Sequence, residues 1–342
     1  MRYSLFSVVD HYPSEPRTTR QLYAQILDEM ELADRLGYAG YFVAEHHFHE
    51  YGVAPAPPVL LGAAAARTRR LGLGTAVAVL PFHDPVRLAE EYAMLDQISG
   101  GRLMLGVGSG YLAHEFAGFG VDPAEKRERF DETLAALETA WQGGRFSLGG
   151  HFDRYRDIVL NVLPLQRPVP LWVAILRAEA AYHVGAQGRN LMMIPYASLD
   201  DLSHLGRVTG EYRRGRTEAG IDPADGDALI AFHTHVADTT ATAIAEARPA
   251  LDRYIATRLY ARRRTLEELD ERGLALIGDP DTVAARIASA AQLGMTHVMA
   301  LCNFGGLEAD RVRRAMTLFA TEVMPRVEAL LAAPEADRTA AR

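Results

Sequence analysis

The stretch LGLGTAVAVLPFHDPVRLAEEYAMLDQISGGRLMLGVGSG, from Leu71 to Gly110, decides the fold class of this chain. Its two short apolar runs, Leu71 to Val79 and Leu103 to Val107, are typical of buried strands. Between them, Pro85 to Ser99 carries apolar residues at helical spacing and ends at Gly100. The stretch therefore predicts a β-α-β unit, in which a helix connects two parallel strands.

The same alternation continues in both directions along the chain. Eight strand-helix units in this length favour an α/β fold of the closed (β/α)8 TIM-barrel type over an open doubly wound sheet, with residues 1–342 as a single domain. The other expected strands are Arg2 to Val9, Tyr41 to Ala44, Leu171 to Ile175, Asn190 to Ile194, Leu229 to Val236 and His297 to Leu301. The other expected helices are Thr19 to Leu36, Pro58 to Arg67, Ala124 to Gln142, Ala178 to Gly185, Leu199 to Gly220, Thr242 to Leu259 and Leu307 to Leu331.

Three segments fall outside this alternation. Residues 144–163 alternate in polarity around Gly149-Gly150, which predicts an inserted β-hairpin. Residues 258–275 are rich in Arg and Glu and have no expected strand, so they form either a solvated helix and linker or a mobile lid. Residues 332–342 are expected to be a frayed tail.

Composition excludes several classes of protein. The 342 residues are 49% hydrophobic and 23% charged, as in a globular protein with a large core. A net charge of -8 gives no basic surface for nucleic acid or for an anionic membrane. The single cysteine, Cys302, excludes an internal disulfide and is expected to pack rather than react. No signal-peptide or membrane-spanning pattern is present, which favours the cytoplasm.

The segment GYFVAEHHFHEY, from Gly40 to Tyr51, concentrates the titratable side chains. An apolar run delivers Glu45, His46, His47 and His49 where a strand leaves the core. These residues fit a metal site, a general acid/base site, or loop histidines that only bond to the backbone. Neighbours on an extended strand point to opposite faces and the HExxH spacing is absent, so we expect no metal here.

Several motifs together resemble the bacterial luciferase-like flavin-dependent monooxygenases, above all the luciferase α subunit. They are AEHHFHEYG at Ala44 to Gly52, LGLGTAVAVLPFHDPVRLAEE at Leu71 to Glu91, LDQISGGRLMLGVGSG at Leu95 to Gly110, FGVD at Phe119 to Asp122, LIGDPDTVAARI at Leu276 to Ile287, and MTLFATEVMPRVEAL at Met316 to Leu330. The resemblance runs end to end and is weakest between about Leu199 and Gly273. It independently implies a TIM barrel.

The resemblance also implies a function. The family uses reduced FMN from a separate flavin reductase, which reacts with O2 through a C4a-hydroperoxide to oxidise a small organic substrate, or uses the deazaflavin F420 for hydride transfer. The wording of the motifs favours FMN. A F420-dependent oxidoreductase and a non-catalytic flavin-binding subunit stay open as alternatives, and pairing through helices two and three implies a homodimer.

The resemblance assigns roles to individual residues. His46 matches the catalytic histidine, whose imidazole can hold or move a proton near neutral pH. Glu45 is expected to orient a histidine. Ala76-Val77 matches a non-proline cis peptide under the flavin ring, although sequence alone predicts an ordinary strand there.

The flavin-phosphate end departs from the family pattern. Gly108 and Ser109 stand where the luciferase α subunit has a reactive cysteine and a phosphate-binding arginine. Glycine is expected to leave room for the flavin or a bulky substrate. Arg177 is the candidate replacement for the lost cation, since a guanidinium can bind two phosphate oxygens, with a surface arginine as the alternative. Asp10, His11, Tyr111 and Tyr196 are expected to line the pocket.

Overall fold

The computed structural model describes residues 1–49, 52–258 and 263–333. Within them, eight parallel strands close into a barrel, because β12 pairs with β1 and β9 pairs with β10. In order around the barrel these strands are β1 (Arg2–Ser7), β2 (Gly40–Val43), β3 (Gly72–Thr75), β5 (Leu103–Gly108), β8 (Leu171–Ala174), β9 (Asn190–Met193), β10 (Ala228–Val236) and β12 (His297–Asn303). The TIM barrel predicted from the sequence is confirmed.

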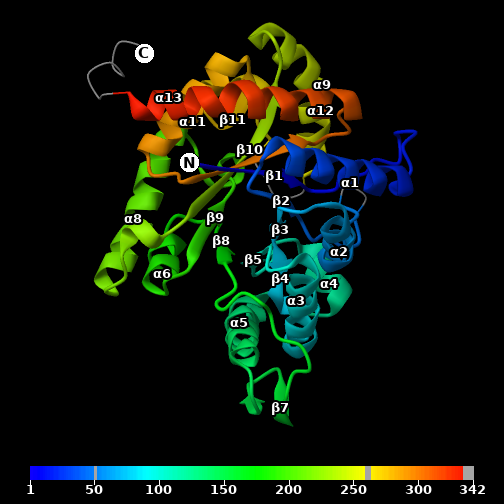
Figure 1. The fold of residues 1–342 in the computed structure, drawn as a ribbon, viewed down its shortest axis with the longest axis vertical. Coiled ribbons are helices and arrows are strands. Elements are labelled where there is room, and N and C mark those ends of the chain that lie inside the picture. The colour runs from blue at the N-terminus through cyan, green and yellow to red at the C-terminus, as the bar shows by residue number, and fades with distance from the viewer. Residues whose placement is uncertain (50–51, 259–262, 334–342) are drawn as a thin grey trace.

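Helices surround this barrel (Figure 1). The main ones are α1 (Thr19–Leu36), α2 (Pro57–Arg67), α3 (Pro85–Ser99), α5 (Lys126–Gln142), α6 (Ala180–Ala186), α8 (Leu205–Glu218), α9 (Thr240–Thr257), α11 (Pro280–Gln292), α12 (Ala309–Leu318) and α13 (Met324–Ala332). Local sequence sets their ends. Helix α1 begins with a capping box formed by Thr18 and Gln21 and ends at Gly37, whose φ of 83° suits glycine.

The run Leu71 to Val79 forms two strands rather than the single strand that was predicted. Strand β3 ends at Thr75, and β4 (Ala78–Val79) resumes after a cis peptide bond between Ala76 and Val77. The non-proline cis peptide implied by the family resemblance is therefore present. Both residues stand at the carboxyl end of the barrel, where the ligands of such folds bind.

Three short elements were not predicted: α4 (Ala113–Phe119), α7 (Pro195–Ser198) and β11 (Ala275–Gly278). Helix α10 (Leu266–Glu271) lies in segment 258–275, for which a solvated helix with a linker was one of the two alternatives. Strand β11 extends the sheet by pairing with the second half of β10. The helix expected over 199–220 begins only at Leu205, and the last helix is interrupted by a π-helical turn at Phe319–Val323.

The inserted hairpin is confirmed as β6 (Phe146–Gly149) and β7 (Arg154–Ile158), which pair antiparallel. It projects below α5, away from the barrel (Figure 1). The Glu132 side chain on α5 holds its turn by accepting the backbone N–H groups of His151, Phe152 and Asp153. The segment 258–275, a helix and linker or a mobile lid, falls partly on residues 259–262, which lie outside the described residues. Most of the predicted tail falls on residues 334–342, which also lie outside them.

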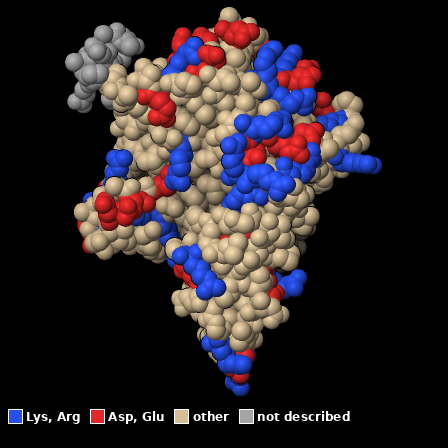
Figure 2. Space-filling view, in the orientation of Figure 1, with Lys and Arg blue, Asp and Glu red and all other residues tan. Residues whose placement is uncertain are grey.

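The outer surface mixes charges of both signs. Figure 2 shows acidic and basic side chains next to one another over the upper part of the visible face, with fewer of either kind around α3. Within the described part of the chain, no helix is both long and apolar enough to cross a membrane.

Candidate active site

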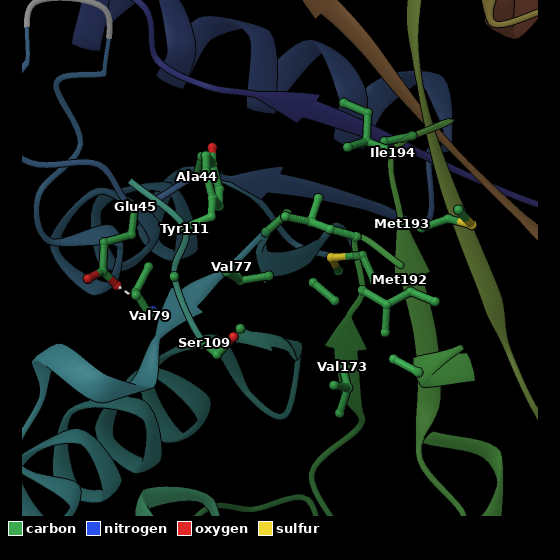
Figure 3. A pocket seen from close by; sticks show the side chains of 18 of the residues that line it. Ala44, Glu45, Val77, Val79, Ser109, Tyr111, Val173, Met192, Met193 and Ile194 are labelled. Carbon is green, nitrogen blue, oxygen red and sulfur yellow. Dashed lines mark hydrogen bonds between the residues drawn. The ribbon is translucent and has the colours of Figure 1, made fainter. Parts of the chain in front are cut away.

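A cavity of about 680 Å³ opens at the carboxyl ends of the barrel strands, within the size range of small-molecule and cofactor sites. Figure 3 shows Val77 and Met192 near its centre, whereas the carboxylate of Glu45 turns away toward Val79. All the residues predicted to be catalytic or to bind the cofactor line this cavity: Glu45, His46, Ala76, Val77, Gly108, Ser109, Tyr111 and Arg177.

His46 stands in the cavity wall with its imidazole 9% exposed. Its Nδ1 donates to Oε1 of Glu115 over 3.0 Å, and the same oxygen accepts the backbone N–H of His47 over 2.9 Å. Burial lowers the pKa of His46, and the adjacent Glu115 carboxylate opposes that shift only in part. Gly52 packs so closely against the ring that a Cβ there would lie 2.4 Å from Cβ of His46. The histidine is therefore neutral and rigidly placed.

Glu45 bonds to two other histidines. Its Oε1 accepts from Nε2 of His47 and Nε2 of His83, each over 2.9 Å, and its Oε2 accepts the backbone N–H of Val79 over 3.1 Å. Burial by itself raises the pKa of Glu45, but these hydrogen bonds and the His83 charge lower it to about 2. Glu45 thus positions histidines, as expected, but they are His47 and His83, and the partner of His46 is Glu115.

The three histidines of the opening segment do not converge. His46 bonds to Glu115, His47 bonds to Glu45, and the His49 ring lies 5.5 Å from that of His114. Within the described residues, no group of three His, Cys, Asp or Glu side chains is arranged to hold a metal ion.

The floor of the cavity is apolar and includes Ala76, Val77 and Gly108. A Cβ at Gly108 would lie 2.6 Å from Cγ2 of Val77. Gly108 thus lines the cavity without a side chain, and the Val77 side chain, which also faces the cavity, occupies the space beside it. That this glycine leaves room for the flavin or a bulky substrate stays a prediction.

Basic side chains line another part of the cavity. Arg177 lies exposed in the turn between β8 and α6, and Lys126 and Arg127 stand at the start of α5. Sequence reasoning singled out only Arg177. The sequence does mark Lys126 in one way, because it is the single lysine of the chain.

Three of the residues expected to line the pocket do not. Asp10 is buried, and its Oδ2 accepts from the Tyr12 hydroxyl and the Gly305 backbone N–H. His11 donates from Nε2 to the carbonyl of Arg17, and the Tyr196 ring packs against His233. Only Tyr111 of that group reaches the cavity, where its ring lies edge-on to His46 at 6.3 Å.

Residues 1–297 match the family model described as luciferase-like monooxygenase. This chain belongs to the luciferase-like monooxygenase family. The agreement extends to the fold, since the crystal structure of monooxygenase RslO1 from Streptomyces bottropensis superposes with a TM-score of 0.88 and 30% identity, covering 95% of this chain and 99% of that one.

Curated relatives of this luciferase-like protein include named monooxygenases. It is 30% identical to the 4-hydroxyprotoasukamycin monooxygenase of Streptomyces nodosus, covering 88% of this chain and 85% of that protein. It is also 30% identical to the oxygenase component of the flavin-dependent trigonelline monooxygenase of Acinetobacter baylyi, covering 70% and 66%. An uncharacterised Sinorhizobium fredii protein, y4wF, is 37% identical, but the chain spans only 60% of its length.

More distant structures share the barrel of this luciferase-like protein but differ in cofactor. The oxygenating constituent of 3,6-diketocamphane monooxygenase from Pseudomonas putida, solved with FMN, has a TM-score of 0.83 at 21% identity over 96% of this chain and 99% of that one. A F420-dependent secondary alcohol dehydrogenase has a TM-score of 0.76 at 18% identity over 95% and 98%. A flavin or F420 thus suits the fold, and the choice between them depends on this chain's own residues.

Proposed function

We propose that this protein is a flavin-dependent monooxygenase that uses reduced FMN and O2 to oxidise a small organic substrate. The observation that carries the proposal is the buried His46–Glu115 pair, which faces a cavity with an apolar floor in a chain of the luciferase-like family. A neutral imidazole fixed by a carboxylate is suited to taking up and returning a proton.

The lining of the cavity matches the parts of FMN. Ala76, Val77 and Gly108 offer an apolar surface for the ring system, and Arg177 with Lys126 would bind the phosphate by charge-assisted hydrogen bonds. Bound reduced flavin supplies the electrons that activate O2. Ser109 and Tyr111 lie between these two regions in the chain and add polar groups at the cavity wall.

His46 would act through the ring nitrogen that Glu115 does not bond. Because Glu115 accepts from Nδ1, proton exchange with the reacting groups falls to Nε2. Glu45, through His47 and His83, holds the loop from which His46 projects. The apolar floor of the cavity would limit the water beside the flavin ring, which protects reactive oxygen species from side reactions.

Partners follow from the same proposal. The trigonelline relative is named as an oxygenase component, which supports a separate reductase as the source of reduced FMN. We also propose a homodimer through α2 and α3, because Val59, Met94 and Ile98 on these helices are 75%, 55% and 56% exposed. The cytoplasm, where such a reductase draws on reduced nicotinamide, is the proposed location.

Cofactor choice tests this function directly. Anaerobic titrations with reduced FMN and reduced F420 are expected to show at least about tenfold tighter binding of reduced FMN. After admission of O2, His46→Ala is expected to release H2O2 from bound FMN faster than the wild type. Tighter binding of reduced F420 would instead favour the F420-dependent oxidoreductase, and a variant indistinguishable from wild type would favour a non-catalytic flavin-binding subunit.

A further inference from the structure

Arg258 is a buried cation in the cavity wall and belongs to a different element from Lys126 and Arg177. It directly follows α9, is 5% exposed, and lines the cavity together with Tyr254 of the same helix. Helix α9 follows β10, whereas Lys126 and Arg177 follow β5 and β8. In the barrel order, one strand, β9, lies between β8, which precedes Arg177, and β10, which precedes α9 and Arg258.

A cluster of aromatic rings holds the Arg258 guanidinium in place. Its central carbon lies 3.7 Å from the centre of the Tyr254 ring, a cation–π contact. Tyr254 also packs edge-on against His233, with ring centres 4.6 Å apart, and His233 in turn packs against Tyr196 and Phe304. The guanidinium is thus seated on a rigid aromatic wall.

His233 adds no second positive charge to this wall. It is fully buried, and neither ring nitrogen has a hydrogen-bond partner among the described residues. Burial and the charge of Arg258 lower the pKa of His233 to about 3, so the ring is neutral at physiological pH. Arg258 is accordingly the cation of this wall.

The charge of Arg258 already acts on one buried carboxylate, because it partly offsets the rise in the pKa of Asp10 that burial causes. The cavity wall also has apolar members: Phe6 of β1, Val8 just after it, Ala231 of β10 and Met299 of β12. The guanidinium also contributes to the lowered pKa of His46, so its charge is felt at the proposed proton-handling group. A cavity wall that joins apolar side chains with a buried cation favours a ligand with a hydrocarbon body and one negative group.

We propose that Arg258 binds the carboxylate of an apolar or aromatic organic acid and so orients this acid, the substrate of the monooxygenation, toward His46. That this acid is the substrate rests on the proposed function, but binding of the acid at Arg258 does not require FMN. A guanidinium suits a carboxylate because its planar fork donates two parallel hydrogen bonds. The hydrocarbon part would lie against Phe6, Val8 and Met299.

Paired probes test the charge preference. Calorimetric titrations would use 2-naphthoate with 2-naphthamide and cyclohexanecarboxylate with its amide, since each pair differs chiefly in charge. Wild-type protein is expected to bind each acid at least about tenfold more tightly than its amide, and Arg258→Met to reduce the ratio to about one. Equal affinities for acid and amide in the wild type, or an unchanged ratio in Arg258→Met, would overturn the proposal.

Matched variants show whether the preference for acids comes from the Arg258 guanidinium itself. Arg248→Gln removes an exposed α9 cation that is paired with Glu267 and does not line the cavity, so it should keep the wild-type ratio. Arg258→Lys keeps the charge without the fork and should keep a reduced preference of about threefold or more, which covers the case in which Arg258→Met fails to fold. Equal acid and amide affinities in folded Arg258→Lys would count against the proposal.

FMN titrations of the same variants distinguish the two proposals. Arg258→Met should bind FMN as the wild type does, because the proposed phosphate site is formed by Lys126 and Arg177 on other elements. If Arg258→Met weakens FMN binding and leaves the acid-to-amide ratio unchanged, Arg258 serves the cofactor and the inference is wrong. If the wild type prefers acids through Arg258 but binds neither FMN nor reduced FMN, the inference stands and the proposed monooxygenase function falls.

Discussion

The imidazole Nδ1 of His46 lies 3.0 Å from Oε1 of Glu115, a residue 69 positions further along the chain. The Glu115 side chain is 2% exposed, and its same oxygen also bonds the backbone of His47. This carboxylate therefore fixes both the ring orientation and the tautomer of His46. Helix α4 presents this carboxylate to the site.

Replacing Glu115 with Gln is expected to move the pH dependence of turnover. Burial lowers the pKa of His46 and the Glu115 carboxylate raises it, so removing the carboxylate lowers that pKa further. The limb of the pH–kcat profile that belongs to His46 should move to lower pH by about one unit or more, with kcat reduced roughly tenfold or more. A pH series of steady-state rates measures both effects.

Glu128→Gln is the matched control, since it removes an exposed carboxylate from the first turn of α5. Its profile should coincide with that of the wild type. A fall in kcat for Glu115→Gln with no movement of either limb would mean that Glu115 has only a structural role.

Glu45→Gln is expected to destabilise the fold by about 3 kcal/mol near pH 5.5, because it breaks a buried network of two histidines and one backbone N–H. The pKa of Glu45 is lowered to about 2, so its contribution is complete above its ordinary pKa and is lost as pH falls toward 2. The pKa of His83 is raised, because the Glu45 carboxylate outweighs the effect of burial. The stability that His83 contributes is therefore complete below the ordinary pKa of histidine and is lost as pH rises through the raised pKa.

Urea unfolding of the wild type and Glu45→Gln across pH 3 to 9 measures this dependence. The difference between them should be largest between the ordinary pKa values of Glu and His and should shrink on both sides. Asp252→Asn, an exposed site on α9, should track the wild type throughout. A difference that stays constant with pH would contradict the charged network.

The repeating pattern of the sequence was sufficient to predict the barrel. Long helices with clear caps, such as α1 and α3, were predicted with correct bounds because their apolar spacing and end residues agree. The misses were short. Strand β11 has four residues, and α4 has seven residues and no side-chain cap at Leu112, so neither has enough periodic positions to be recognised.

Most of the predicted site residues lie within the family motifs, whereas Arg177 was predicted from its place after a strand. His46 and the Ala76–Val77 peptide lie within the family motifs AEHHFHEYG and LGLGTAVAVLPFHDPVRLAEE. Glu115 and Arg258 reach the site from distant elements, and no local pattern shows which strand end faces them. The pairing of Glu45 with His83 has the same origin, since the two residues are 38 positions apart.

Gly108→Ala is expected to weaken FMN binding about tenfold. The new Cβ would lie 2.6 Å from Cγ2 of Val77, so the Val77 side chain must move on the cavity floor, and overpacking of this kind costs about 1–3 kcal/mol. Fluorescence titration of FMN measures the change. Gly210→Ala on α8, whose Cβ would meet nothing within 4 Å, is the control and should leave FMN binding unchanged. Unchanged FMN binding in Gly108→Ala would mean that Val77 does not contact the flavin.

Lys126, as the single lysine, allows the proposed phosphate site to be tested by chemical labelling. An amine-reactive acetylating reagent can modify only Lys126 and the amino terminus in this chain, and the two products separate by peptide mass. Met1 provides an internal reference, because its amino group lies beside Glu328 and does not line the cavity. If Lys126 contacts the FMN phosphate, saturating FMN should slow acetylation of Lys126 at least about fivefold and leave Met1 unaffected.

Lys126→Gln should weaken FMN binding about 3- to 10-fold, and Lys126→Arg should preserve it, since the phosphate needs a cation rather than a particular side chain. Equal labelling with and without FMN would show that Lys126 does not contact the FMN phosphate, and Arg177 would remain as the candidate.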